Sequence, residues 1–433
     1  MAIPVETVLL IFGGLIFVGY FGELLSKRFS VPSALLLLAI GFTFKLTGFV
    51  NVESFIGFQD IFSTLALIIL LFDGGLSLNI FEVLFKSGRV LAVGFIITVL
   101  SMIGTGLLFM LMGFNPLIGA ILGAIAGGLG SSTTISIVKG LSLPPEIKNY
   151  LVLESSITDV FSIIFAIVFT QALVYGTFDI SFISQGIVGR FSIGAFLGIM
   201  VGVASILMLS RIEKGYNYVI TFAIMLILYS VAEFLGGSGA ISVLTFGLLL
   251  GNEVTVRKIV RSNHQQEYPV IQEFQSEISF FVRTFFFVFL GIIVSLGNVT
   301  NFIVAFALMV LLYLIRYAVV YFSTMKSPFF NYYKVLSAIN PRGLATAALA
   351  TYPLMVVEQS LQTGKNAYLS SLIPHLSALS EISFYLIILS IVFTTILVPI
   401  SMKKDKSGNG NNSGLGAENP SEEVTITPLN QKN

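Results

Sequence analysis

Long apolar runs separated by short polar breaks dominate the chain. A helix that crosses a bilayer needs about 20 apolar residues, and runs of that length recur up to residue 401. Ten-residue segments of alternating polarity, the signature of a membrane β-barrel, do not occur in the sequence. We therefore predict an all-α polytopic membrane protein of about thirteen transmembrane helices. The predicted spans are 5–25, 31–50, 59–79, 90–112, 115–138, 148–175, 191–210, 216–235, 238–252, 276–296, 300–324, 333–357 and 381–401.

The composition agrees with this prediction. Of the 433 residues, 55% are hydrophobic and 10% are charged, whereas a soluble domain carries about 25% charged residues. The chain has no cysteine, and its two histidines fall in predicted loops, so we expect neither a thiolate metal site nor a catalytic triad. We predict a protein that is not an enzyme, needs no cofactor and does not bind nucleic acid. The net charge of +1 by itself says nothing about nucleic acid.

The basic residues of the loops lie mostly on one side. With the amino terminus outside, sixteen of the 23 Lys and Arg residues fall on inner loops and three on outer loops. This bias follows the positive-inside rule and predicts a multi-pass cell-membrane protein with its carboxyl terminus in the cytoplasm. Residues 1–402 form the predicted membrane domain, with 1–28 as its first span and not a cleaved signal. Residues 403–433 are polar and predict a disordered cytoplasmic tail.

Six ionisable residues lie inside predicted spans, where each costs roughly 2.5–3.5 kcal/mol to insert. Structural ion pairs are one explanation for them. A purely structural bundle does better with apolar packing, so we expect at least one of the six to be functional. They are Asp73, Glu154, Asp159, Arg283, Arg316 and Arg342.

Asp159 lies near the middle of its predicted span. Ser155 precedes it by four residues and shares its helix face, which Ser162 continues. Glu154 lies on another face, at a depth comparable with that of Arg342, so these two can pair. Asp159 is the carboxylate that we expect to be left free.

Two predicted spans contain strong helix breakers. Residues 123–134 read GAIAGGLGSSTT, and residues 340–343 read NPRG. Glycine clusters and Asn-Pro disfavour a continuous helix, and unwound backbone survives in a membrane only where protein or a wet cavity surrounds it. Paired interruptions in the two halves of a chain point to the ion site of a transporter. Close helix packing through small residues is the alternative for the first span alone.

Such breaks would place hard oxygen ligands beside Asp159. Free carbonyls, the hydroxyls of Ser131, Ser132 and Thr133, and one carboxylate suit a small hard cation. A buried carboxylate that holds either a proton or a cation, but not both, is sufficient for exchange of the two.

The residues also resemble a known family, the cation–proton antiporter superfamily and in particular its NhaP-like sodium–proton exchanger branch. The resemblance covers about 330 residues, and its motifs occur in the expected order. They are LFDGGL (71–76), ESSITD (154–159), GGSGA (236–240), FGL (246–248), FFFVFLG (285–291) and NPRG (340–343).

The resemblance implies roles for single residues. Asp159 matches the aspartate that carries cation and proton, Ser155 its hydroxyl partner, and Asp73 an acidic residue that helps to line the site. Glu154 and Arg342 match a structural ion pair. The family also implies inverted repeats, two crossed broken helices, a core that moves against a dimerisation domain by alternating access, and a homodimer in the lipid bilayer.

Two departures from the family pattern bear on the substrate. The first break lacks the family's Asp, and its Ser-Ser-Thr resembles the potassium-efflux branch, although the tail is too short for that branch's nucleotide-binding domain. Thr158 stands where the family has Asn or, in electrogenic members, Asp. We therefore predict electroneutral 1:1 exchange of Na⁺ or Li⁺ for H⁺, with K⁺/H⁺ antiport as the alternative and no other metal at Asp159.

Other classes of protein fit less well. A channel needs a continuous wet path with repeated weak sites, and a two-aspartate intramembrane protease would have to use Asp73 with Asp159. An organic-anion carrier would need cations such as Arg283 facing its site. Arg283 is instead a candidate to compensate the charge of a helix end or of Asp73, and Arg316 is expected to be structural.

Overall fold

The computed structural model consists of helices, and it describes residues 13–14, 16–22, 24–25, 33–47, 59–77, 88–175, 180–209, 217–260, 280–282, 284–292, 298–363 and 367–408. The helices with defined bounds in this part of the chain are α2 (Ser33–Leu46), α4 (Gln59–Ser77), α5 (Gly88–Leu111), α6 (Pro116–Gly127), α7 (Ser131–Lys139), α8 (Pro145–Tyr175), α9 (Ile180–Leu209), α10 (Asn217–Phe234), α11 (Gly239–Gly251), α12 (Glu253–Val260), α14 (Val299–Thr324), η2 (Pro328–Tyr332), α15 (Tyr333–Ala338), α16 (Leu344–Thr363) and α17 (Ala367–Gly408).

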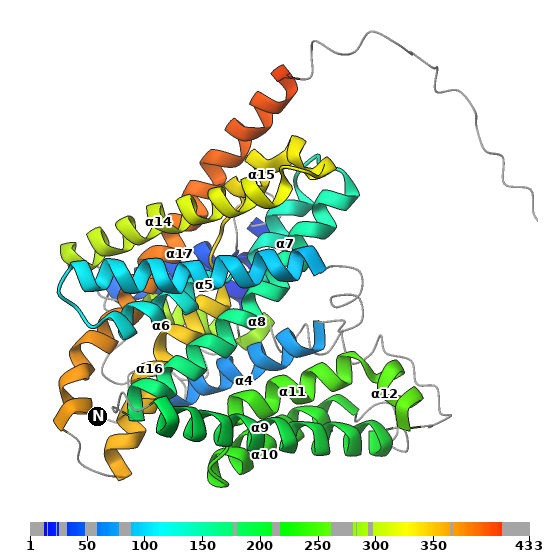
Figure 1. Cartoon of the computed structure of the whole chain (residues 1–433), viewed down its shortest axis with the longest axis vertical. Helices are drawn as coiled ribbons and strands as arrows, with labels where there is room; N and C mark the ends of the chain where they lie inside the picture. The colour runs from blue at the N-terminus through cyan, green and yellow to red at the C-terminus, as the bar shows by residue number, and fades with distance from the viewer. Residues whose placement is uncertain are drawn as a thin grey trace, which may run out of the picture.

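These helices pack as two groups. We call α5–α8 and α14–α17 the core bundle, and α4 with α9–α12 the scaffold, because most helix contacts fall within each group. Figure 1 shows α9, α10, α11 and α12 along the lower edge of the view, with α5, α14 and α17 above them. The largest buried apolar cluster joins the groups, from Phe72 in α4 and Phe246 in α11 to Ile125 in α6 and Leu349 in α16.

The core bundle repeats one unit. In α5–α8 and again in α14–α17, a helix is followed by a broken helix and then by another helix. The chain leaves the helix at 128–130 and at 339–343, which confirms that both predicted breakers interrupt their helices. The two breaks meet, since a Cβ on Gly130 would lie 2.6 Å from the Gly343 nitrogen. Gly130 also has a φ of +62°, which only glycine adopts without strain.

Five described helices are long and apolar enough to cross a membrane: Gly88–Leu111, Pro145–Val174, Val188–Met208, Val299–Thr324 and Tyr368–Met402. Shorter apolar helices lie before and between them in the chain, among them Thr64–Leu76 and Gly239–Gly251. The protein is therefore all-helical and polytopic. The total of thirteen spans stays a prediction, because parts of the predicted spans 5–25 and 276–296 lie outside the described residues.

The last helix is longer than predicted at both ends. It begins at Ala367 instead of 381, so His375 is helical and not in a loop, and it continues to Gly408 through residues assigned to the tail. Lys403, Lys404 and Lys406 are good helix formers and are favourable near a helix carboxyl end, which explains the extension. The rest of the tail, 409–433, lies outside the described residues.

A short helix also replaces part of a predicted loop. In α12, Glu253 and Arg257 pair one turn apart, an arrangement that stabilises short helices. The Arg257 side chain is buried and donates from its NH2 group to the Ile206 carbonyl oxygen near the end of α9 (2.9 Å). One basic residue counted as a loop charge therefore has a structural contact.

We expect two neighbouring glycines of α4 to differ in their tolerance of a methyl group. A Cβ on Gly75 would press on the Leu244 carbonyl oxygen in α11, whereas a Cβ on Gly74 would make ordinary contacts of 3.9 Å with Val160 and Ile163. Gly75→Ala should destabilise the fold by about 1–3 kcal/mol through overpacking. Thermal unfolding in detergent measures this, with Gly74→Ala as the matched control. Equal unfolding temperatures for the two variants would contradict the packing described for α4 and α11.

Candidate functional site

Asp159 lies at the crossing of the two breaks. Its side chain is 7% exposed. The backbone N–H of Gly130 donates to Oδ1 (3.0 Å), and that of Ser131 donates to Oδ2 (2.8 Å). Ser131 is the first residue of α7, so the carboxylate covers the positive amino-terminal end of that half-helix. Asp159 makes no salt bridge among the described residues.

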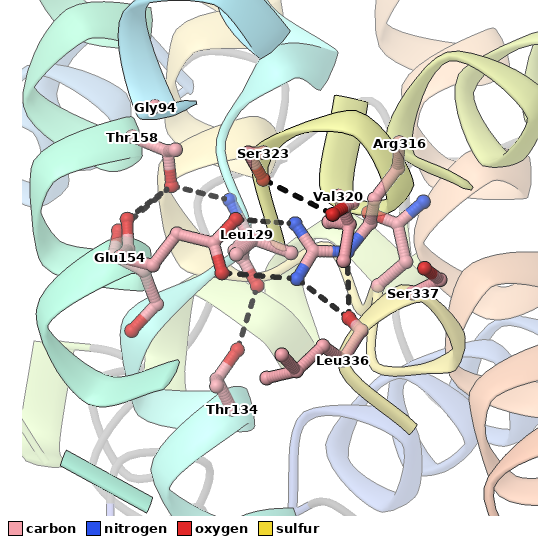
Figure 2. Close-up of polar contacts among 12 residues, drawn as sticks. Gly94, Leu129, Thr134, Glu154, Thr158, Arg316, Val320, Ser323, Leu336 and Ser337 are labelled. Atoms are coloured by element: carbon pink, nitrogen blue, oxygen red, sulfur yellow. Dashed lines mark hydrogen bonds and ion pairs between the residues drawn. The ribbon is translucent and has the colours of Figure 1, made fainter. Parts of the chain in front are cut away.

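Two threonines hold the unwound segment between α6 and α7: Thr158 from α8 and Thr134 from α7. The Leu129 N–H donates to Thr158 Oγ1 (3.2 Å), and Thr134 Oγ1 donates to the Leu129 carbonyl oxygen (3.0 Å). Thr158 Oγ1 in turn donates to the Glu154 carbonyl oxygen (2.9 Å), and Figure 2 shows these contacts together. Thr158 thus satisfies unwound backbone through its side chain, which a membrane interior demands.

The second break is held by α17 and reaches the first. The Arg342 N–H donates to Ser390 Oγ (2.9 Å) and the Asn340 N–H to Thr394 Oγ1 (3.3 Å). The buried Arg342 side chain donates from its NH1 group to the Gly128 carbonyl oxygen, just beyond the end of α6. Arg342 therefore neutralises the negative end of a half-helix and lies beside the Asp159 site.

Glu154 pairs with Arg316, so the predicted pair of Glu154 with Arg342 is wrong. Arg316 NH1 donates to Glu154 Oε1 (2.7 Å) and NH2 donates to Oε2 (3.1 Å), with the side chains 1% and 0% exposed. Arg316 also donates to the Leu336 carbonyl oxygen in the last turn of α15, and Figure 2 shows it between Glu154 and Leu336. Depth along a helix predicted Arg342 as the partner, and Arg316 was expected only to be structural. The direction in which each side chain leaves its segment decided between them.

The structure also places several of the other predicted site residues. Ser155 is buried, and its hydroxyl donates to the Val152 carbonyl oxygen (2.9 Å) of its own helix. Thr133 is buried against Gly343, where a Cβ would lie 3.2 Å from Thr133 Oγ1. Asp73 is half-buried in α4, next to Gly74, which faces α8. The Ser132 side chain and Arg283 lie outside the described residues.

Ser162 and Thr346 contribute more to the site than the sequence indicated. A Cβ on Gly128 would lie 2.7 Å from Asp159 Oδ1 and 2.9 Å from Ser162 Oγ, so the three groups are in close contact. Ser162 Oγ is buried with no hydrogen-bond partner among the described residues. Thr346 Oγ1 donates to the Ile125 carbonyl oxygen (3.2 Å) near the end of α6. The sequence placed Ser162 on the helix face of Asp159 without giving it a role in the site, and Thr346 carried no signal.

The described groups around Asp159 offer oxygen atoms and backbone N–H groups. Among the described residues, no group of three or more His, Cys, Asp or Glu side chains is close enough to hold a metal ion. What surrounds Asp159 is one carboxylate, a hydroxyl and unwound backbone. Oxygen ligands of this kind suit hard cations.

Crossed half-helices around a midplane carboxylate are the architecture of secondary transporters. Residues 13–403 match the family described as sodium/hydrogen exchanger, transmembrane. The chain belongs to this family, which confirms the resemblance seen in the motifs and the prediction of a transporter that is not an enzyme.

Similar proteins with curated descriptions match over part of their length. The K⁺/H⁺ antiporter NhaP2 of Shewanella sp. (strain ANA-3) is 29% identical over 241 residues, which are 53% of this chain and 41% of that protein. The K⁺/H⁺ antiporter NhaP of Alkalimonas amylolytica is 25% identical over 261 residues, 57% of this chain and 44% of that protein. The matched regions thus span less than half the length of these relatives.

A solved structure shares the fold. The sodium proton antiporter MjNhaP1 from Methanocaldococcus jannaschii at pH 8 superposes with a TM-score of 0.73 and 20% identity, covering 91% of this chain and 100% of that chain. At this identity the likeness shows the fold, and the arrangement around Asp159 is described from this chain's own residues.

We expect Glu154 and Arg316 to be energetically coupled. Removing one partner of a buried ion pair leaves an uncompensated charge and costs about 3–5 kcal/mol. Glu154→Gln and Arg316→Met should therefore each lower stability strongly, and the double variant should be destabilised by much less than the sum. A double-mutant cycle on thermal unfolding measures the coupling, with the Glu154 and Arg342 cycle as comparison. Additive effects of Glu154→Gln and Arg316→Met would contradict the pairing.

Proposed function

We propose that the protein is a monovalent cation/proton antiporter in which both substrates compete for Asp159. The observation that carries the proposal is the Asp159 carboxylate, buried at the crossing and held by the N–H groups of Gly130 and Ser131. Burial favours the protonated form of a carboxylic acid, whereas N–H donors favour the carboxylate. These opposed influences suit a group that exchanges a proton for a cation.

The charges around the site support one-for-one exchange. Glu154 and Arg316 neutralise each other, which leaves Asp159 as the acid next to the breaks and Arg342 as its nearby base. Loading Asp159 with H⁺ or with a monovalent cation adds the same charge to the site. The transporter cycle is therefore proposed to be electroneutral, with one cation exchanged for one proton.

Na⁺ or Li⁺ is the cation that the resemblance to sodium–proton exchangers favours, and K⁺ is the second candidate. Two observations support K⁺: the break carries Ser131, Ser132 and Thr133 in place of an aspartate, and two relatives are named K⁺/H⁺ antiporters. Both candidates use the same carboxylate and backbone oxygens, so the choice between them is a matter of measurement.

Alternating access is proposed to occur between the core bundle and the scaffold. The broken helices belong to the core bundle, while α4 of the scaffold carries Asp73 and contacts α8 at the neighbouring Gly74. Ser155, Thr158, Ser131, Ser132 and Thr133 are proposed to help bind the cation or shape its site. We further propose a homodimer in the cell membrane, with the amino terminus outside and the carboxyl terminus in the cytoplasm, as the loop charges and the family resemblance indicate.

Exchange should depend on Asp159. In liposomes with an imposed pH gradient and an internal pH dye, we expect the wild-type protein to dissipate the gradient when Na⁺, Li⁺ or K⁺ is added. Asp159→Asn should abolish this response, because an amide neither titrates nor carries charge. The control is thermal unfolding, which should remain cooperative in Asp159→Asn. Exchange by Asp159→Asn at the wild-type rate would rule out the proposed site.

Transport should be independent of membrane potential. One net charge moved through 100 mV changes the free energy by about 2.3 kcal/mol, so an electrogenic cycle would respond strongly to an imposed potential. We expect equal exchange rates in vesicles clamped at zero and at inside-negative potential. A rate that follows the potential would contradict the 1:1 ratio, and a cation current without proton movement would favour a channel.

A further inference from the structure

A polar cavity lies between the core bundle and the scaffold, near the carboxyl-terminal ends of α8 and α16. It has a volume of about 240 Å³. The core bundle contributes Gln171, Tyr352 and Gln359 to its lining, and the scaffold contributes Arg190, Tyr229 and Glu233. In Figure 1, α9 and α10 lie along the lower edge of the view, below α8 and α16. The cavity is lined by residues of all four helices. Any motion of one group against the other would change its width.

The scaffold wall carries an ion pair that water can reach. Arg190 NH2 donates to Glu233 Oε2 (2.9 Å), with side chains 32% and 24% exposed. The same NH2 group donates to the Gly237 carbonyl oxygen (3.3 Å), and the Gly239 N–H at the start of α11 donates to Glu233 Oε1 (2.8 Å). Arg190 Nε is buried without a hydrogen-bond partner among the described residues. The hydrogen-bonding capacity of Arg190 is thus only partly used. Because both side chains are also partly exposed, Glu233 could exchange Arg190 for another cation.

Two hydroxyls without hydrogen-bond partners among the described residues lie along α8 between Asp159 and this cavity. Ser162 and Thr170 follow Asp159 by three and eleven residues, so they lie on the same face of α8. Both hydroxyls are buried and have no hydrogen-bond partner within the described part of the chain. Val174, one turn beyond Thr170, lines the cavity. The cavity begins about 18 Å from Asp159, which is the rise of twelve helical residues from Asp159 to Gln171.

The chemistry of the lining suits the transported ion. Gln171, Tyr352 and Gln359 offer neutral oxygens, and Glu233 offers a carboxylate. This is the ligand type of hard monovalent cations. A carboxylate in a cleft of low dielectric constant also raises the local concentration of cations. Arg190 is the cation that holds this carboxylate in the present structure.

We propose that the cavity is a vestibule in which an alkali cation binds to Glu233 on its way to or from Asp159, in competition with Arg190. The inference rests on the proposed antiport. In this arrangement Arg190 is a built-in competitor that occupies Glu233 whenever the vestibule holds no cation. The alternative is a purely structural ion pair that stabilises the turn between α10 and α11, and the experiment has to exclude it.

The test compares Glu233→Gln with Arg190→Gln in vesicles of the two orientations, with the exchange rate measured against the concentration of Na⁺, Li⁺ or K⁺. Glutamine at 233 keeps an oxygen for the Gly239 N–H and loses the charge. We expect Glu233→Gln to raise the half-saturating cation concentration about two- to fivefold, the size of a partly exposed ion interaction. Arg190→Gln should lower it by a similar factor. Both effects should occur only when the cation is added at the vestibule face, with an unchanged maximal rate.

Glu253→Gln is the matched control, because Glu253 also pairs with an arginine in the scaffold but lies near the other end of α9. It should leave the half-saturating concentration at the vestibule face unchanged. Three outcomes would assign the pair to structure alone, provided that the wild-type protein exchanges ions. The half-saturating concentration shifts in the same direction in Glu233→Gln and Arg190→Gln, or it shifts at both faces, or it does not shift in either variant. A wild-type protein that is silent in tight vesicles would instead overturn the proposed antiport, and the vestibule with it.

Discussion

Two interrupted helices cross at Gly130 and Gly343, and the crossing leaves four helix ends inside the protein. Each end carries partial charge and unpaired backbone groups, which lipid cannot satisfy. Arg342 covers the end of α6, Arg316 covers the last turn of α15, and Asp159 covers the start of α7. The crossing therefore depends on these buried charges, because they satisfy the helix ends that it leaves inside the protein.

These charges divide into a structural set and an exchangeable one. Arg316 is bound by Glu154 through two hydrogen bonds and by a carbonyl oxygen, with both side chains excluded from solvent. Around the Asp159 oxygens lie the N–H groups of Gly130 and Ser131 and the hydroxyls of Ser131 and Ser162, with Arg342 nearby. A carboxylate held in this way can lose or gain a small ion without dismantling the core bundle. The same constraint that stabilises the crossing therefore supplies the proposed transport chemistry.

The scaffold is built by a different principle from the core bundle. Its helices approach closely through small residues, as at Gly75 in α4. Its described buried charges, Glu253 and Arg257, pair within α12 and not at a helix crossing. Glu233, near the end of α10, and its partner Arg190 in α9 lie on the cavity that faces α8 and α16. The interface between the scaffold and the core bundle is where the proposed alternating-access motion would take place.

The sequence by itself determined the membrane class, the two helix breaks, the family and Asp159 as the candidate carboxylate. These follow from local properties: apolar length, glycine and proline chemistry, and the four-residue spacing of helix faces. Only the tertiary structure decided that Glu154 pairs with Arg316, that Arg342 binds the Gly128 carbonyl, and that residues from α8, α9, α10 and α16 share a cavity. Partner choice depends on helix rotation and on the path of unwound backbone. Neither is set by local sequence, because several arginines lie at the right depth and the contacts join residues 43 to 214 positions apart.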